Sequence, residues 1–174
     1  MKLFPTAEAQ SVYQINFRRL HEIGIRGLIF DIDNTLVEHN APADARAVKL
    51  FERIRGCELN TCLLSNNKEP RVKDFADTVG SLYLHKAGKP LAKGYLKAME
   101  LMRTEPETTL FIGDQLFTDI WGASNAGIRS VLVQRIAFHE EIQIHLKRIP
   151  EGAVLLFYRL LPRKRDIALE GALR

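Results

Sequence analysis

The sequence predicts an α/β fold in three layers, a Rossmann-like parallel sheet of about five strands with helices on both faces. Short apolar runs alternate with segments of helical spacing, which is the order expected of strand–helix–strand crossovers. Several of these runs are apolar throughout, as in strands that are buried on both faces. A chain of 174 residues can bury a substantial core, so we expect one domain over residues 1–174, with its core at about 25–135.

Each expected element has its own local signal. The apolar runs that we interpret as strands are residues 27–30, 61–64, 82–84, 109–113 and 130–133. Helical spacing, with proline or polar residues at the start and glycine at several ends, predicts helices at residues 6–23, 42–55, 70–79, 91–103 and from about 117. In the helix at 91–103, Leu96, Met99 and Met102 are expected to face inward.

Composition and charge exclude several classes of protein. The two cysteines, Cys57 and Cys62, form no disulfide framework and have no zinc spacing around them. No run approaches the roughly 18 apolar residues of a membrane-spanning helix, and the N-terminus lacks the regions of a signal peptide, so we expect a cytoplasmic protein. Residues 147–174 carry seven basic and three acidic side chains, which accounts for the whole net charge of +4. This basic C-terminal segment is either solvated charge or a contact for a phospholipid surface or nucleic acid.

Polar groups follow four of the predicted strands. Asp31 and Asp33 end the first, Ser65 the second and Asp114 the fourth, while Lys89 follows the third. Because parallel strands all point the same way, these groups are expected to meet at one edge of the sheet. Taken alone, Asp33 and its neighbours could instead cap a helix or make a turn; the convergence of four strand ends favours a catalytic site.

The residue types at this edge indicate a phosphoester substrate and a magnesium ion. Asp31, the backbone carbonyl of Asp33, and Asp114 are candidate ligands, because hard oxygen donors with open positions suit Mg²⁺. Ser65 and Lys89 on the same rim suit a tetrahedral anion. The glycine-rich phosphate loops of kinases and dehydrogenases are missing from the sequence.

These motifs resemble the haloacid dehalogenase superfamily of phosphohydrolases. The resemblance rests on the run of residues 31–36, on Ser65, on Lys89 followed by proline, and on Gly113-Asp114 with Asp119, over roughly residues 25–135. The neighbouring residues are most similar to the YqeG-like subfamily of IIIA-type phosphatases, which is related to the mitochondrial phosphatidylglycerophosphate phosphatases.

The resemblance implies a role for each matched residue. Asp31 would attack phosphorus and form an aspartyl-phosphate, while Asp33 would protonate the leaving oxygen and then activate water. Ser65 and Lys89 would hold the phosphoryl oxygens. Asp114 would ligate Mg²⁺, and Asp119 would support the lysine or the metal.

Some neighbouring residues have more than one interpretation. Asn66 is a further candidate phosphate ligand, although Asn66 or Asn67 could instead cap the helix that begins at Pro70. Lys86 competes with Lys89 for the phosphate, and the family motif favours Lys89. His39 and His85 are the only histidines near the predicted edge.

The spacing of the motifs predicts an enzyme without a cap domain. Only one helix and one strand fit between Asp33 and Ser65, and again between Ser65 and Lys89, which are the places where other superfamily members insert caps. An open site would admit a large substrate, such as the headgroup of phosphatidylglycerophosphate, or be covered by a partner subunit. Apolar and basic residues at 153–165 would suit peripheral attachment to an anionic membrane, although a final helix docked on the sheet is the favoured explanation of the apolar half. Nucleic acid is the less favoured partner.

The first alternative is a phosphatase that acts on another phosphorylated metabolite, on a protein or on a nucleic-acid end. Two other kinds of function are less favoured. A receiver-type phosphoacceptor domain also gathers acids and a lysine at one sheet edge, but its paired acids are adjacent and its phosphorylated Asp lies on a later strand. A degenerate binding module would lack part of the motif set, and here every motif residue is present.

Overall fold

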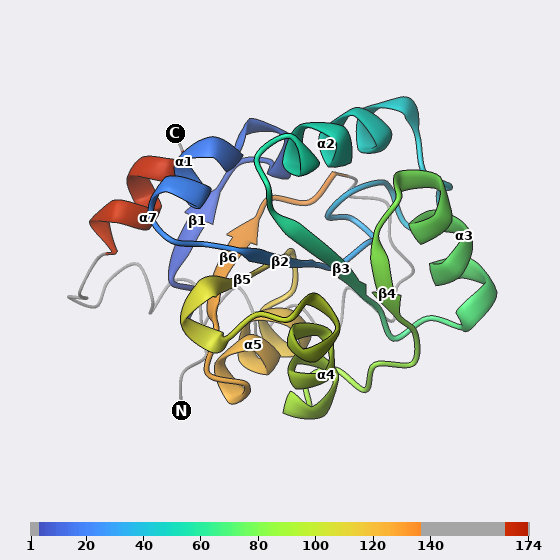
Figure 1. The fold of residues 1–174 in the computed structure, drawn as a ribbon. Coiled ribbons are helices and arrows are strands. Elements are labelled where there is room, and N and C mark those ends of the chain that lie inside the picture. Colours follow the sequence, from blue (N-terminus) through green and yellow to red (C-terminus); the bar gives the residue numbers. More distant parts are fainter. Residues whose placement is uncertain (1–3, 137–165, 174) are drawn as a thin grey trace.

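The structure, a computed structural model, describes residues 4–136 and 166–173. Within these ranges six parallel strands form one sheet in the order β1-β6-β5-β2-β3-β4 (Figure 1). The strands are β1 (Ala7–Ala9), β2 (Gly27–Phe30), β3 (Asn60–Leu64), β4 (Leu82–Leu84), β5 (Thr109–Gly113) and β6 (Arg129–Val133). The predicted parallel α/β sheet is therefore confirmed, with one strand more than expected.

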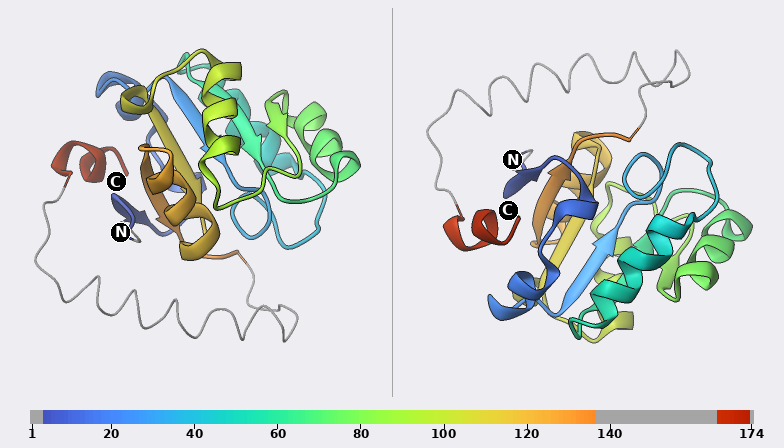
Figure 2. Two further views of the ribbon diagram at one scale, coloured as in Figure 1. Left: turned by 90° about the horizontal axis from the view of Figure 1, so that it is seen from below. Right: turned by 90° about the horizontal axis from the view of Figure 1, so that it is seen from above.

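Helices cover both faces of the sheet, as Figures 1 and 2 show. The helices on one face are α1 (Phe17–Glu22), α2 (Ala45–Arg55), α3 (Glu69–Val79) and α7 (Ile167–Ala172). Those on the other are α4 (Ala92–Met102) and α5 (Trp121–Asn125). Two separate clusters of buried apolar side chains fill the spaces between the layers. The sheet is thus the middle layer of three.

Local sequence signals set the ends of the helices next to the site. Asp44 caps α2, because its carboxylate accepts a hydrogen bond from the Ala47 N–H at 2.7 Å. In α3, Pro70 lies in the first turn, where its missing N–H costs no helical hydrogen bond. Gly80, with φ of 70°, ends α3 in the left-handed conformation that glycine adopts most readily.

The leading helix predicted at residues 6–23 is wrong. This segment forms β1, a 3₁₀ turn η1 (Val12–Gln14), and the short helix α1. The side chains of Ser11 and Asn16 each accept a backbone hydrogen bond, and these residues are the N-caps of η1 and α1. The residues of β1, Ala7–Ala9, pair with β6 instead. This pairing satisfies the backbone groups that a helix would otherwise satisfy locally.

Leu96 was expected in the core, but 51% of it is exposed. Met99 and Met102 face inward as predicted, and Tyr95 and Ala98 lie on the same buried side of the helix. Their spacing of three and four residues defines one helical face, and Leu96 lies outside it.

The chain has no cap at either place where one was considered. One helix and one strand, α2 and β3, lie between Asp33 and Ser65, and α3 and β4 lie between Ser65 and Lys89. The predicted capless arrangement is therefore confirmed.

The C-terminal end of the described chain packs on the first helix. In α7, Leu169 and Ala172 are fully buried, and the Ala172 carbonyl accepts a hydrogen bond from the Asn16 N–H at 3.2 Å. The stretch at 153–165 lies outside the described residues, so its attachment to a membrane stays a prediction. In the part of the chain that the structure describes, no helix is long and apolar enough to cross a bilayer.

Candidate active site

The carboxyl ends of β2, β3 and β5 bring the predicted site residues together. Phe30, the last residue of β2, lies beside Leu63 of β3 and Ile112 of β5, and the Asp31 N–H still donates to the Ile112 carbonyl at 3.0 Å. Asp31 therefore stands between Ser65 and Asp114 in an ordered part of the sheet.

A pocket of about 180 Å³ opens at this edge. Every side chain in its lining is polar, and the lining consists of Asp31, Asp33, Asn34, His39, Ser65, Asn66, Asn67, Lys89, Gln115 and Thr118. Five of the predicted site residues are among them. Asp114 and Asp119 lie beside the pocket, next to Asp31.

Lys89 is the buried cation of the site. Its ammonium lies 2.5 Å from Asp31 Oδ1 and 2.7 Å from Asp119 Oδ1, and its side chain is only 5% exposed. Burial alone would lower the pKa of Lys89, but the carboxylates of Asp119 and Asp31 raise it above its ordinary value. The lysine is therefore charged, whereas the competing candidate Lys86 is exposed and does not line the pocket.

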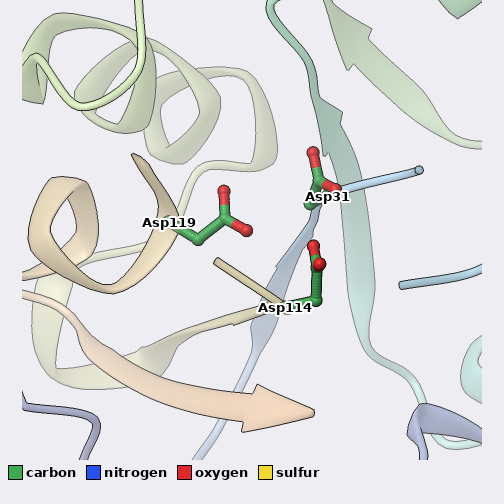
Figure 3. Close-up of side chains that lie close together, drawn as sticks. All are labelled: Asp31, Asp114 and Asp119. Carbon is green, nitrogen blue, oxygen red and sulfur yellow. The ribbon is translucent and has the colours of Figure 1, made fainter. Parts of the chain in front are cut away.

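Three buried acids surround the floor of the pocket. One carboxylate oxygen from each of Asp31, Asp114 and Asp119 lies within 4.8 Å of the others, and Figure 3 shows the three side chains close together. Burial raises the pKa of Asp31 to about 7, with Asp119 adding to the shift and Lys89 opposing it. Burial also raises the pKa of Asp114, and both neighbouring acids add to that shift.

A divalent cation fits this donor set. Lys89 and Arg135, whose Nε lies 3.5 Å from Asp114 Oδ2, bring two positive charges to three acids. Two cations beside three carboxyl groups leave the site one positive charge short of neutrality when all three acids are ionised. Hard carboxylate oxygens around such a deficit suit Mg²⁺.

Asp119 is better placed to orient the lysine than to ligate a metal. Its Oδ1 accepts from Lys89, and its Oδ2 accepts from the Gln115 N–H at 3.1 Å. Asp31 and Asp114 are then the side chains that can offer oxygen to an ion. Of the two roles predicted for Asp119, support of the lysine agrees with these contacts.

Asp33 is held by three hydrogen bonds on the rim of the pocket. Its Oδ1 accepts from the Asn40 N–H at 2.8 Å and from Arg71 at 3.2 Å, and its Oδ2 accepts from the Asn67 amide at 2.7 Å. Asn34, with φ of 63°, makes the turn that follows. The local turn considered from the sequence is thus real, and Asp33 lines the pocket as well.

The two asparagines after Ser65 connect loops and do not cap α3. Asn66 accepts from the Lys89 N–H at 2.8 Å and donates to the Lys89 carbonyl at 3.2 Å, which ties the end of β3 to the lysine loop. Asn67 donates to Asp33, and the N-cap of α3 is Lys68. The expected cap by one of these asparagines is wrong, because long-range partners use both side chains.

Sequence reasoning missed several groups around the pocket. Gln115 and Thr118 line it, and they are joined by a hydrogen bond of 2.9 Å from the Thr118 hydroxyl to the Gln115 side-chain oxygen. Both residues follow Asp114 closely in the sequence, and this position after a predicted strand end could have indicated that they lie at the site. His39 lines the pocket, whereas His85 lies 3.9 Å from Glu69 and outside the lining.

Comparisons with known proteins agree with this geometry. A family model described as HAD-hydrolase-like matches residues 86–149. The chain is 33% identical over 167 residues to a Bacillus subtilis protein named Probable phosphatase YqeG, and the match covers 95% of each chain. It is 30% identical over 88 residues to glyceraldehyde 3-phosphate phosphatase of Pyrococcus furiosus, a match that covers 51% of this chain and 31% of that protein.

The solved structures support the fold. The structure of NagD from E. coli K-12 is 15% identical, with a TM-score of 0.56, and the match covers 86% of this chain and 99% of that one.

Proposed function

The chain belongs to the haloacid dehalogenase-like hydrolase family, and on that premise we propose that it is a Mg²⁺-dependent phosphatase that hydrolyses phosphomonoesters through an aspartyl-phosphate on Asp31. The observation that carries this proposal is the place of Asp31, which lines the pocket, contacts Lys89 and lies next to Asp114 and Asp119. Asp33 lies two residues away on the rim, where it can reach a leaving group.

The first half of the reaction transfers the phosphoryl group to Asp31. A carboxylate oxygen of Asp31 forms the new bond to phosphorus while the bond to the leaving oxygen breaks. Asp33, as the general acid, donates a proton to that oxygen. Ser65 and Lys89 hold the phosphoryl oxygens, with Asn66 fixing the backbone of Lys89.

The second half releases inorganic phosphate. Asp33 removes a proton from water, the water oxygen bonds to phosphorus, and the bond to Asp31 breaks. Mg²⁺, held by Asp31, Asp114 and the backbone carbonyl of Asp33, would neutralise charge on the transferring group.

We propose phosphatidylglycerophosphate as the substrate, with phosphatidylglycerol as the product. Every residue that lines the pocket can offer a hydrogen bond, which suits a glycerol leaving group, and the absence of a cap in the segments on either side of Ser65 leaves room for a lipid headgroup. The predicted peripheral attachment through residues 153–165 would bring the site to the bilayer surface.

The phosphatase proposal is tested with p-nitrophenyl phosphate. We expect turnover that requires Mg²⁺ and is abolished by EDTA, and that is lost in Asp31→Asn and severely reduced in Asp33→Asn. Asp74→Asn, which makes the same change at an exposed site on α3, is the control and should keep wild-type activity. Wild-type turnover by folded Asp31→Asn would sink the nucleophile assignment. A stable phosphoprotein without turnover would favour the receiver-type alternative.

The substrate is tested by kcat/KM on phosphatidylglycerophosphate in mixed micelles, beside sugar phosphates, nucleotides and a phosphopeptide. We expect the highest value for the lipid. A lipid value no higher than the others would discard this substrate and leave the phosphatase proposal intact.

A further inference from the structure

Arg71, in the first turn of α3, contacts the proposed acid–base and lies outside the pocket lining. Its Nη2 is 3.2 Å from Asp33 Oδ1, and the two side chains are 20% and 13% exposed. Building on the phosphatase proposal, we propose that Arg71 is a positioning residue that holds the Asp33 carboxyl toward the leaving group.

The guanidinium of Arg71 also packs against an aromatic ring of the core. It lies over the ring of Phe75, 5.5 Å from the ring centroid, and Phe75 is fully buried in the core one helical turn further along α3. The orientation of Arg71 is therefore fixed by a rigid element, and the contact joins Asp33 to a helix that begins 36 residues later in the chain.

Arg71 differs from the other two partners of Asp33. The Asn40 N–H and the Asn67 amide are neutral donors, whereas Arg71 brings a full charge to Oδ1. All three hydrogen bonds are charge-assisted when the Asp33 carboxyl is ionised, but only Arg71 adds a positive charge and so makes an ion pair with it. Without it, the Asp33 carboxyl would keep two partners and lose the one that is anchored in the core.

Misplacement of Asp33 has a specific chemical signature. An alkoxide such as glycerolate is strongly basic and needs a proton as it leaves, whereas p-nitrophenolate leaves without one. Loss of Arg71 should therefore slow hydrolysis of an alkyl phosphate more than hydrolysis of the aryl phosphate. A variant that was merely less stable would slow both reactions equally.

The test compares Arg71→Met with wild type on glycerol 3-phosphate and p-nitrophenyl phosphate, using kcat/KM for each. We expect the ratio of alkyl to aryl kcat/KM to fall about 10-fold, a fraction of the 10²–10⁴ that acid–base catalysis contributes. Lys73→Met removes an exposed cation from the same helix and should leave the ratio unchanged. Arg71→Lys, which restores the charge, should recover part of the loss.

An unchanged ratio in folded Arg71→Met, whether both rates fall together or neither falls, would overturn the inference. If circular dichroism shows that the Met variant is unfolded, Arg71→Gln, which keeps most of the stem over Phe75, is judged by the same ratio. Absence of turnover in wild type would instead refute the proposed function, so the two failures are distinguishable.

Discussion

Asp31 and Asp114 are buried carboxyl groups whose negative charge Lys89 and Arg135 offset only in part. The pKa of Asp31 rises from 3.8 to about 7 through burial, so the folded protein binds a proton that the unfolded chain releases between these values. Stability falls with rising pH wherever the folded state binds more protons. The free energy of unfolding without metal should therefore decrease across this window, and a bound divalent cation should remove the penalty.

We predict that, in EDTA, the Tm of wild type falls from about pH 5 to about pH 8 by more than that of Asp114→Asn, which has one buried charge fewer. At about pH 8 the Asn variant should be the more stable of the two without metal, although it is inactive. Mg²⁺ should raise the Tm of wild type and leave that of the variant nearly unchanged. Differential scanning fluorimetry across the pH series measures both effects, and a metal-free Asn variant less stable than wild type at about pH 8 would contradict the charge argument.

The turn after β5 positions the side chain of Asp119 through close packing as well as through charge. A Cβ built on Gly113 would lie 2.4 Å from Asp119 Oδ2, closer than any real contact. The side chain of Asp119 therefore occupies space that only glycine leaves free, and from there it orients Lys89. The π-helical turn η3 (Leu116–Ile120) carries Asp119 into this position.

We predict that Gly113→Ala lowers kcat/KM by about 10²-fold, because a displacement of about 1 Å at a catalytic group can cost that much. Gly171→Ala is the matched control, since a Cβ there would have no neighbour within 4 Å. Activity assays on the two variants, with Tm as the check on folding, decide the point. A fully active Gly113→Ala would show that Asp119 can move without loss.

The sequence predicted the elements whose signals are local. The strands that end in Asp31, Ser65 and Asp114 are apolar runs with polar ends, and the structure places them together. β1 has no such signal: two alanines and a glutamate become a strand only because β6 lies beside them. The contact of Arg71 with Asp33 crosses 38 residues and two elements, so no spacing rule could reveal it.

At the scale of the whole molecule, α7 joins the end of the described chain to its beginning. It contacts α1 and β1, and no residue of the pocket lining belongs to it. Its attachment should therefore control stability and leave the chemistry unchanged.

We predict that Leu169→Ala lowers the free energy of unfolding by about 2–4 kcal/mol, the usual cost of truncating a fully buried leucine. Urea denaturation followed by circular dichroism measures the change, and kcat at a temperature where the variant is folded should match wild type. Leu101→Ala, at a site that is 40% exposed, serves as the control and should cost far less. Equal losses in the two variants would mean that α7 contributes little.

The packing of α7 also decides how the membrane prediction is tested. A chain ending at Glu151 would lose α7 together with the basic segment, so its failure to bind vesicles would be ambiguous. We predict instead that neutralising Arg163, Lys164 and Arg165 to Gln weakens co-sedimentation with anionic vesicles by about 1 kcal/mol per base. Arg53→Gln, at a cation on α2, is the control. Equal binding by the triple variant and wild type would discard peripheral attachment through this segment.

The pairing of β1 with β6 has a consequence for the order in which the protein folds. Thr6 and Ser130, which exchange two hydrogen bonds at this edge, are 124 residues apart, so their contact closes most of the chain into a loop. Closing such a loop is entropically costly, and pairings of this range form after local ones. A chain in which this pairing has not yet formed leaves β6 as an unprotected sheet edge with free backbone groups, which is a template for pairing with other chains. Refolding at high protein concentration should therefore lose material to aggregation at this late step, while the active-site strands β2, β3 and β5 have already assembled.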